Sequence, residues 1–157
     1  MSLNIVLYQP EIPANTGNIS RTCAATNVNL HLIRPLGFST DDKMLKRAGL
    51  DYWDSVNITY YDNVEEFFEK TEGGTHYFIE TFGTKVYSDF DYSNPEEDIY
   101  FMFGKETTGI PRELIKDTNM CLRIPQSTNV RSMNLSNTAA IVIFEALRQR
   151  DFPNMIK

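Results

Sequence analysis

Cysteine is scarce in this sequence, in which 157 residues include only Cys23 and Cys121. The two lie far apart and form no CxxC pair, which excludes a disulfide-stapled scaffold, a thioredoxin-like motif and a cysteine-based metal site. Long apolar runs are missing as well, because the longest, 139–144, is far too short to span a bilayer. No basic segment precedes the first apolar run, so no signal peptide is expected. These absences predict a cytoplasmic protein with reduced thiols and no membrane segment.

Positive charge is also in short supply. The formal net charge is −6 at pH 7 and the pI is about 4.9, which argues against strong nonspecific binding of nucleic acid. The acids are unevenly spread, however, since a cluster of them lies between residues 89 and 98. Lys43, Lys46 and Arg47 form a separate basic cluster. The overall charge therefore does not exclude a local anion-binding face.

Short apolar runs alternate with helical patterns along the chain. With 41% hydrophobic residues in 157, the sequence fits a single domain over residues 1–157 better than two. Runs rich in β-branched and aromatic residues predict strands at Leu3–Tyr8, Leu30–Ile33, Val56–Tyr60, His76–Ile79, Ile99–Phe103 and Cys121–Ile124. Helical spacing predicts helices at Asn15–Thr26, Asp41–Ala48, Val64–Glu69, Pro111–Lys116 and Leu135–Arg150. This alternation predicts an α/β fold with a mostly parallel sheet flanked by helices, and Gly83–Asp98 as a long surface connection.

In such sheets, ligands bind beyond the carboxyl ends of the strands. That rule selects the bends Gln9–Gly17, Glu80–Thr84, Gly104–Gly109 and Pro125–Asn134. Neither the GxxxxGK[ST] phosphate loop nor the GxGxxG dinucleotide pattern occurs in them or elsewhere. A phosphate loop or a dinucleotide site is therefore not predicted.

The first bend carries Asn15 and Gly17 and leads to Arg21, about two turns into the predicted helix. As local structure alone, Asn15 would cap the helix and Arg21 would be a solvated charge. For an isolated NxGxxxR pattern, that interpretation is the favoured one. As a binding feature, the guanidinium of Arg21 could meet an anion or a ribose hydroxyl. The pattern leaves both interpretations open.

The two later bends carry further polar candidates. Glu106 lies between two turn glycines, where its carboxylate can accept hydrogen bonds from a ligand or a neighbouring loop, although an ordinary strand-to-helix turn explains it equally well. Arg131, Ser132 and Asn134 precede the last helix, and either Ser132 or Asn134 is expected to be its N-cap. Capping and ligand binding can coexist at such a position.

The histidines favour structural roles, because His31 lies in an apolar strand and His76 stands beside aromatic residues. No spacing suggests a nucleophile–histidine–acid arrangement or a set of metal ligands. The sequence therefore gives no support for a metal site or for such a triad.

Three motifs occur in one order: NTGNISR at 15–21, FGKETTG at 103–109 and IPQSTNVRSMNLSN at 124–137. Together they resemble the SPOUT superfamily of knotted, S-adenosylmethionine-dependent RNA methyltransferases, in particular its ribose 2′-O-methylating branch. The resemblance covers nearly the whole chain, including RAGLDYW at 47–53, and is strongest to the minimal members that modify the tRNA wobble nucleoside.

This resemblance implies a C-terminal trefoil knot, with the knot and the S-adenosylmethionine site within roughly residues 76–150. It also implies a homodimer and a tRNA substrate. The expected reaction is methyl transfer to the ribose 2′-hydroxyl of the wobble nucleotide, cytidine or uridine 34. Because the methyl group of a sulfonium is already electrophilic, no metal is expected.

The resemblance implies the site residues as well. Arg21 matches the catalytic arginine, which is expected to serve the partner subunit's site. The other expected catalytic residues are Asn15, Glu106, Ser132 and Asn134. The donor is expected to contact Ile79, Thr81, Gly104, Ile124, Ser132 and Met133, largely through backbone atoms.

Two other functions fit parts of the pattern. A catalytically silent RNA-binding knotted dimer would share the fold, but the presence of Arg21, Glu106, Ser132 and Asn134 argues against it. A flavodoxin-like nucleotide-binding domain would share the alternation of strands and helices, but the missing phosphate loop argues against that one.

Overall fold

The computed structural model describes residues 2–39 and 41–157, and for residues 49–51 it describes the backbone only. The strands are β1 (Leu3–Tyr8), β2 (Asn29–Ile33), β3 (Ile58–Tyr61), β4 (Thr75–Ile79), β5 (Lys85–Val86), β6 (Ile99–Phe103) and β7 (Cys121–Arg123). The α-helices are α1 (Pro13–Thr26), α2 (Lys43–Gly49), α3 (Val64–Lys70) and α4 (Leu135–Gln149). Single turns of 3-10 helix are η2 (Tyr87–Asp89), η3 (Arg112–Leu114) and η4 (Thr118–Met120), and η1 (Leu50–Ser55) follows α2.

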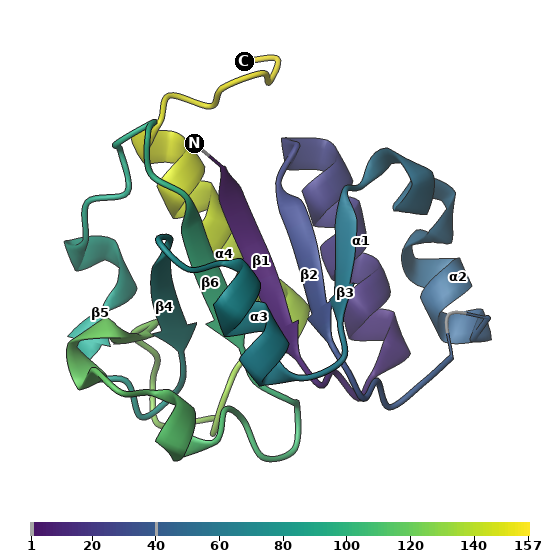
Figure 1. The fold of residues 1–157 in the computed structure, drawn as a ribbon, viewed down its shortest axis with the longest axis horizontal. Helices are drawn as coiled ribbons and strands as arrows, with labels where there is room; N and C mark the ends of the chain where they lie inside the picture. The colour runs from purple at the N-terminus through teal and green to yellow at the C-terminus, as the bar shows by residue number, and fades with distance from the viewer. Residues whose placement is uncertain (1, 40) are drawn as a thin grey trace.

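Within the described residues, the strands form a seven-stranded sheet in the order β3-β2-β1-β6-β4-β7-β5, with every neighbouring pair parallel (Figure 1). The central strands β1 and β6 are almost wholly buried. A strand covered on both faces is apolar at consecutive positions, which explains the unbroken runs LNIVLY and IYFMF. The predicted α/β fold with a mostly parallel sheet is therefore confirmed.

Helices cover both faces of the sheet. Because side chains alternate along a strand, Ile5 and Val6 of β1 face opposite ways. Ile5 belongs to a core that includes Ile19 of α1 and Val142 of α4, and Val6 belongs to a second core built around Phe67 of α3. Figure 1 shows this layering, with α3 in front of the sheet and α1 and α4 behind it.

Several predicted boundaries differ from the structure. The first helix begins at Pro13 with Ile12 as its N-cap, so Asn15 lies inside the first turn and is not a cap. The prediction of a helix at Pro111–Lys116 is wrong, because the chain makes only the single turn η3 before it turns again at η4. The interpretation of Gly83–Asp98 as irregular connection missed β5, whose two residues are too few to leave an alternating pattern.

Both cysteines are buried free thiols, as the composition predicted. Burial raises the pKa of the Cys23 thiol to about 12, which keeps it protonated and unreactive. Among the described helices, none has the length and apolar character needed to traverse a bilayer.

The parallel sheet brings the selected bends together at one edge. The backbone N–H of Glu80, just beyond β4, donates to the carbonyl of Leu122 in β7 at 2.9 Å. The bend after β6 lies beside them, because β6 pairs with β4 in the same direction. Three bends from distant parts of the sequence therefore border one space.

Candidate functional site

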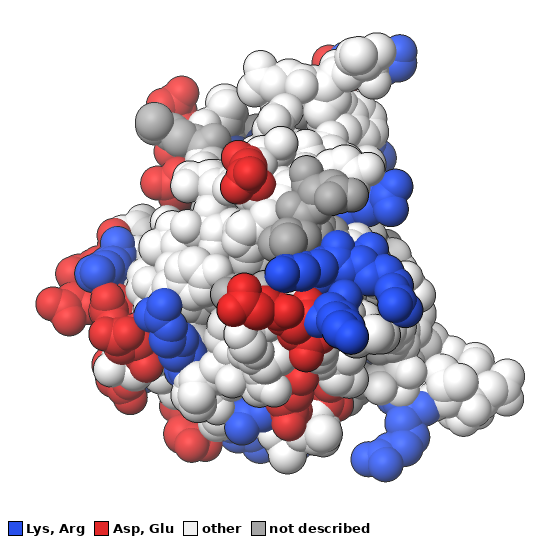
Figure 2. Space-filling model, turned by 90° about the vertical axis from the view of Figure 1, so that its right-hand side faces the viewer, with Lys and Arg blue, Asp and Glu red and all other residues white. Residues whose placement is uncertain are grey.

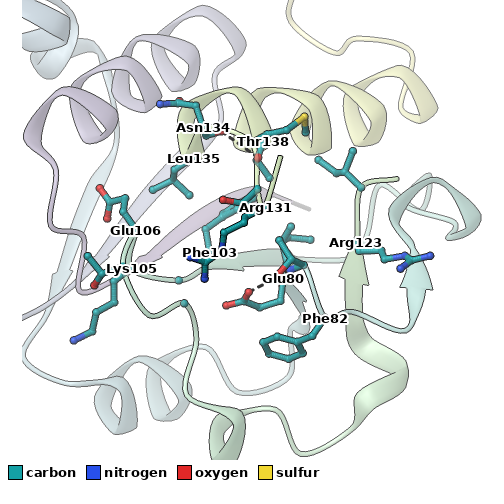
Figure 3. Close-up of a pocket in the computed structure, with 18 of the residues that line it drawn as sticks. Glu80, Phe82, Phe103, Lys105, Glu106, Arg123, Arg131, Asn134, Leu135 and Thr138 are labelled. Atoms are coloured by element: carbon teal, nitrogen blue, oxygen red, sulfur yellow. Dashed lines mark hydrogen bonds between the residues drawn. The ribbon is translucent and has the colours of Figure 1, made fainter. Parts of the chain in front are cut away.

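A cavity of about 810 Å³ opens at the carboxyl ends of β4, β6 and β7 (Figure 3). Its wall comprises Ile12, Asn15 and residues 79–82, 103–109, 123–126, 131–135 and 138. Three of the four bends selected from the sequence thus supply most of the lining, and the first bend supplies the rest. The position agrees with the rule that ligands of parallel sheets bind beyond the carboxyl ends of the strands.

The residues expected to contact a methyl donor all lie in this wall. They are Ile79, Thr81, Gly104, Ile124, Ser132 and Met133. They come from the bends that follow β4, β6 and β7, so the structure brings the set together from three separate segments. Apolar side chains from Phe103 and Leu135 complete a lining in which polar and apolar groups are mixed.

Three of the expected catalytic residues form one hydrogen-bonded chain on the same wall. Asn134 donates from its side-chain Nδ2 to Oδ1 of Asn15 at 3.1 Å. Asn15 in turn donates from Nδ2 to Oε2 of Glu106 at 3.2 Å. Asn15 is buried, and an amide bonded through both of its polar atoms is held in one orientation.

Asn134 has a second role at the start of α4. Its Oδ1 accepts hydrogen bonds from the backbone N–H groups of Ser136 at 2.9 Å and Asn137 at 3.4 Å, which makes it the N-cap of the helix. The cap fixes which way the amide points, and Nδ2 is thereby directed at Asn15. Of the two cap candidates in the sequence, Asn134 is therefore the cap, and Ser132 remains an exposed residue of the cavity wall.

Hydrogen bonds to two glutamates, Glu106 and Glu11, connect the first bend to the third. Glu106 accepts hydrogen bonds from the backbone N–H groups of Glu11 at 3.0 Å and Ile12 at 2.8 Å. Glu11 accepts in return from the side-chain hydroxyl of Thr107 at 2.6 Å and from its backbone N–H at 3.1 Å. These hydrogen bonds lower the pKa of the Glu11 carboxyl. The carboxylate of Glu106 is thus held by the protein and positions Asn15.

The third bend is too tight for larger residues at two places. A Cβ atom on Gly104 would lie 2.2 Å from the backbone carbon of Gly109. Gly109 has a φ of +74°, a conformation that side chains disfavour. Both glycines of the FGKETTG motif are therefore required by the backbone path that shapes the cavity.

Arg21 lies apart from the other expected catalytic residues. It is exposed on α1, and its guanidinium carbon lies 5.1 Å from the ring centre of Tyr52. It does not belong to the cavity wall of its own chain as the described residues form it. The structure therefore unites Asn15, Glu106, Ser132 and Asn134 but leaves Arg21 outside.

Sequence reasoning missed several cavity residues. Glu80 was placed in a selected bend but was not proposed as a site residue, and its carboxylate lines the cavity. Phe82 lines the rim and is covered by the guanidinium of Arg112, whose carbon lies 4.0 Å from the ring centre. An acid or an aromatic after a strand is common in turns, so the pattern gave no reason to select either.

The histidines lie outside this cavity, as expected for structural residues. His31 is buried, with Nδ1 2.8 Å from the hydroxyl of Tyr61 and Nε2 2.8 Å from Oδ1 of Asn4. Burial lowers the pKa of His31 to about 4, so its ring is neutral at pH 7. Across residues 2–39 and 41–157, no group of three His, Cys, Asp or Glu side chains is arranged to hold a metal ion.

Comparison with known proteins identifies the class of fold and then the family. The structure of an AdoMet-bound rRNA methyltransferase from Sinorhizobium meliloti superposes with a TM-score of 0.83 at 25% identity, over 94% of this chain and 56% of that one. The sequence matches the SpoU rRNA Methylase family over residues 2–144, and the chain belongs to that family. This membership argues against the flavodoxin-like alternative.

Two proteins that align with this chain over nearly their full length are more similar to it in sequence. A candidate tRNA (cytidine(34)-2′-O)-methyltransferase of Listeria monocytogenes is 66% identical over 158 aligned positions, which cover 100% of this chain and 94% of the relative. A solved structure that concerns the 2-OH methylation of C/U34 on tRNA is 40% identical and covers 94% of this chain and 95% of that one. Its TM-score is 0.86, so sequence and fold similarity extend together over nearly the entire chain.

Proposed function

We propose that this protein is a tRNA methyltransferase that transfers the methyl group of S-adenosylmethionine to the ribose 2′-hydroxyl of nucleotide 34, a cytidine or a uridine. The observation that carries the proposal is the chain Asn134–Asn15–Glu106, set in the wall of a cavity that all the expected donor contacts also line. The relatives named for cytidine 34 or for C/U34 support the choice of nucleotide.

The cavity suits S-adenosylmethionine in size and chemistry. Its volume of about 810 Å³ lies within the range of small-molecule sites. Ile79, Ile124 and Leu135 offer apolar surface for a nucleobase, and the surrounding bends offer backbone groups for hydrogen bonds. The residues that we expect to hold the donor are Ile79, Thr81, Gly104, Ile124, Ser132 and Met133. When bound, the donor supplies an electrophilic methyl group that needs no metal to activate it.

The work left to the protein is to align the ribose oxygen and to stabilise the charge that develops on it. Alignment alone can lower such a barrier by roughly 7–11 kcal/mol. A guanidinium offers a planar fork of N–H donors and no acceptor, so Arg21 is unsuited to act as a general base. We assign it an electrostatic role, in which its fork of donors stabilises the developing alkoxide and an adjacent phosphate. The Asn134–Asn15–Glu106 chain would keep the opposing wall of the site rigid.

The role that we assign to Arg21 implies a homodimer. Arg21 lies on the exposed side of α1, outside the cavity of its own chain. A second copy of the chain would therefore have to bring its Arg21 to this cavity, and symmetry would complete two sites at once. The C-terminal trefoil knot within roughly residues 76–150 and the cytoplasmic location remain part of the same proposal.

The tRNA would need a basic face on an otherwise acidic protein. Figure 2 shows basic side chains gathered on the side of the molecule that carries α2. Lys43, Lys46 and Arg47 of α2 are all exposed. Together with Arg34 and Arg131, they are the residues that we expect to contact tRNA phosphates.

Methylation of unmodified bulk tRNA with a labelled donor tests the proposal. After transfer, the tRNA is digested and the labelled nucleotide is mapped. We expect label only on the ribose of nucleotide 34. Label on a base or at another position would contradict the proposed substrate, and tRNA binding with no label would support the silent RNA-binding alternative instead.

A further inference from the structure

Glu80 is a carboxylate in the donor cavity to which the proposed function assigns no role. It follows the last residue of β4, and it lies between Ile79 and Thr81, both expected donor contacts. Its Oε1 accepts a hydrogen bond from the backbone N–H of Ile110 at 2.5 Å, and its Oε2 accepts one from Thr81 at 3.3 Å. The carboxylate therefore joins the bend after β4 to the bend after β6.

The neighbouring backbone makes room for this group. A Cβ atom on Gly109 would lie 2.2 Å from Oε1 of Glu80, so only a glycine allows the carboxylate to approach so closely. Burial raises the pKa of the Glu80 carboxyl above its usual value, and the N–H donors of Ile110 and Thr81 and the charge of Arg112 offset this only in part. A partly buried carboxylate is costly to keep unless something interacts with its charge. The neighbours of Glu80 thus compensate its negative charge only in part, which leaves it able to interact with a cation in the cavity.

The other charged residues of the cavity are arranged differently. Lys105, Arg123 and Arg131 also line it, which gives three cations in the wall. Figure 3 shows Lys105 and Arg123 pointing away from Glu80. Glu106 is already engaged by the backbone of the first bend and by Asn15. Glu106 thus accepts from three N–H groups, whereas Glu80 accepts from two and stands between two expected donor contacts, so Glu80 is the lining carboxylate better placed to face the donor.

We infer that Glu80 provides the negative charge by which the cavity binds the cationic methyl donor in preference to the uncharged thioether that remains after transfer. The inference rests on the proposed function and adds a specificity residue to it. The sulfur carries a positive charge before transfer and none afterwards. A nearby carboxylate attracts the first form more strongly, because charge–charge attraction is enhanced where solvent is partly excluded. The same difference would favour release of the product.

Calorimetric titration of the Glu80→Gln variant tests this role. Glutamine keeps an oxygen that can accept from Ile110, so the bend is retained while the charge is lost. The probes are S-adenosylmethionine, S-adenosylhomocysteine and sinefungin, which carries an amine in place of the methylsulfonium. We expect the affinity for both cationic ligands to fall about tenfold, with less than about a twofold change for S-adenosylhomocysteine. Glu96→Gln, which removes one charge from an exposed position, should leave all three affinities unchanged.

An equal loss for all three ligands would overturn the inference, because Glu80 would then hold a group that they share or would only support the bend. No change for any ligand would overturn it too. In both cases the wild-type protein still binds the donor, so the proposed function stands. Failure of the wild-type protein to bind S-adenosylmethionine would refute the proposed function and this inference with it.

Discussion

Asn134 and Asn15 are 119 residues apart in the sequence, and their side-chain amides are joined by a hydrogen bond of 3.1 Å. The bond connects the N-cap of α4 to the first turn of α1. Through Asn15 it reaches Glu106, which holds the backbone of the first bend. The starts of the two helices on one face of the sheet are thereby tied to the loop between β6 and η3.

Asn134 combines capping and positioning, and two substitutions separate them. Asn134→Ala removes both, so the free energy of unfolding should fall by about 1 kcal/mol, the usual value of an N-cap. Asn134→Asp keeps an oxygen that caps α4 but offers no N–H to Asn15. Its thermal stability should therefore exceed that of the alanine variant, while its rate of methyl transfer should be as low. Thermal unfolding and single-turnover assays on both variants check this, and a fully active aspartate variant would show that the link to Asn15 is dispensable.

Arg21 should matter for transfer and not for donor binding. Arg21→Ala should lower the single-turnover rate by about a hundredfold or more, the usual effect of removing a donor to a developing oxyanion. Arg21→Lys keeps the charge but loses the planar fork, so its rate should also be reduced. Both variants should bind S-adenosylhomocysteine as the wild-type protein does. A lysine variant with the full rate would exclude a role for the fork, and loss of ligand binding would place Arg21 in the donor site.

Mixed dimers reveal whether Arg21 acts across subunits. An Arg21→Ala chain and an Asn134→Ala chain should each be inactive when they form homodimers. Random exchange should produce mixed dimers with one intact site each, and roughly a quarter of the wild-type activity should return. Activity that stays at the level of the separate variants would show that both residues serve the site of their own chain.

The basic cluster of α2 should set the salt dependence of tRNA binding. Replacement of Lys43, Lys46 and Arg47 by glutamine should weaken binding and reduce the slope of log K against log salt by up to about 2–3. Lys70 and Arg148 already pair with acids of their own helices, so a double glutamine variant there is a suitable control. Filter binding across a salt series measures both effects. An unchanged slope in the triple variant would exclude this face.

His31 should make the protein sensitive to mild acid. Burial lowers its pKa in the folded state to about 4 from the ordinary 6.5, so the unfolded chain takes up a proton first as the pH falls. The contribution of neutral His31 to stability is complete above pH 6.5 and is lost between pH 6.5 and about 4. By linkage it amounts to about 3 kcal/mol. Denaturant unfolding at several pH values checks this against His31→Gln, whose stability should change less over that window, and identical pH profiles would contradict it.

The sequence predicted most readily what depends on local pattern. β1 and β6 were recognised because strands buried on both faces are apolar at consecutive positions. The convergence of the selected bends was also predicted, because bends at the carboxyl ends of parallel strands meet at one edge. The start of α1 was missed because Asn15 is a common capping residue, whereas Pro13 occupies the first helical turn.

What could not be predicted depends on pairings between distant residues. The bonds of Asn15 reach across 91 and 119 positions, and no local pattern encodes which side chains will meet. The role inferred for Glu80 could not be predicted for the same reason, because it depends on Gly109 and Ile110 of another bend. A knot depends on the path of the whole chain, so that expectation came from the resemblance alone and stays a prediction.

The most direct measurement uses anticodon stem-loops in which a single ribose lacks its 2′-hydroxyl. The protein is given labelled S-adenosylmethionine and one of three RNAs: unaltered, 2′-deoxy at nucleotide 34, or 2′-deoxy at nucleotide 33 as the matched control. We predict transfer to the unaltered RNA and to the control, and none to the RNA that lacks the hydroxyl at nucleotide 34. Equal labelling of all three RNAs would contradict the account.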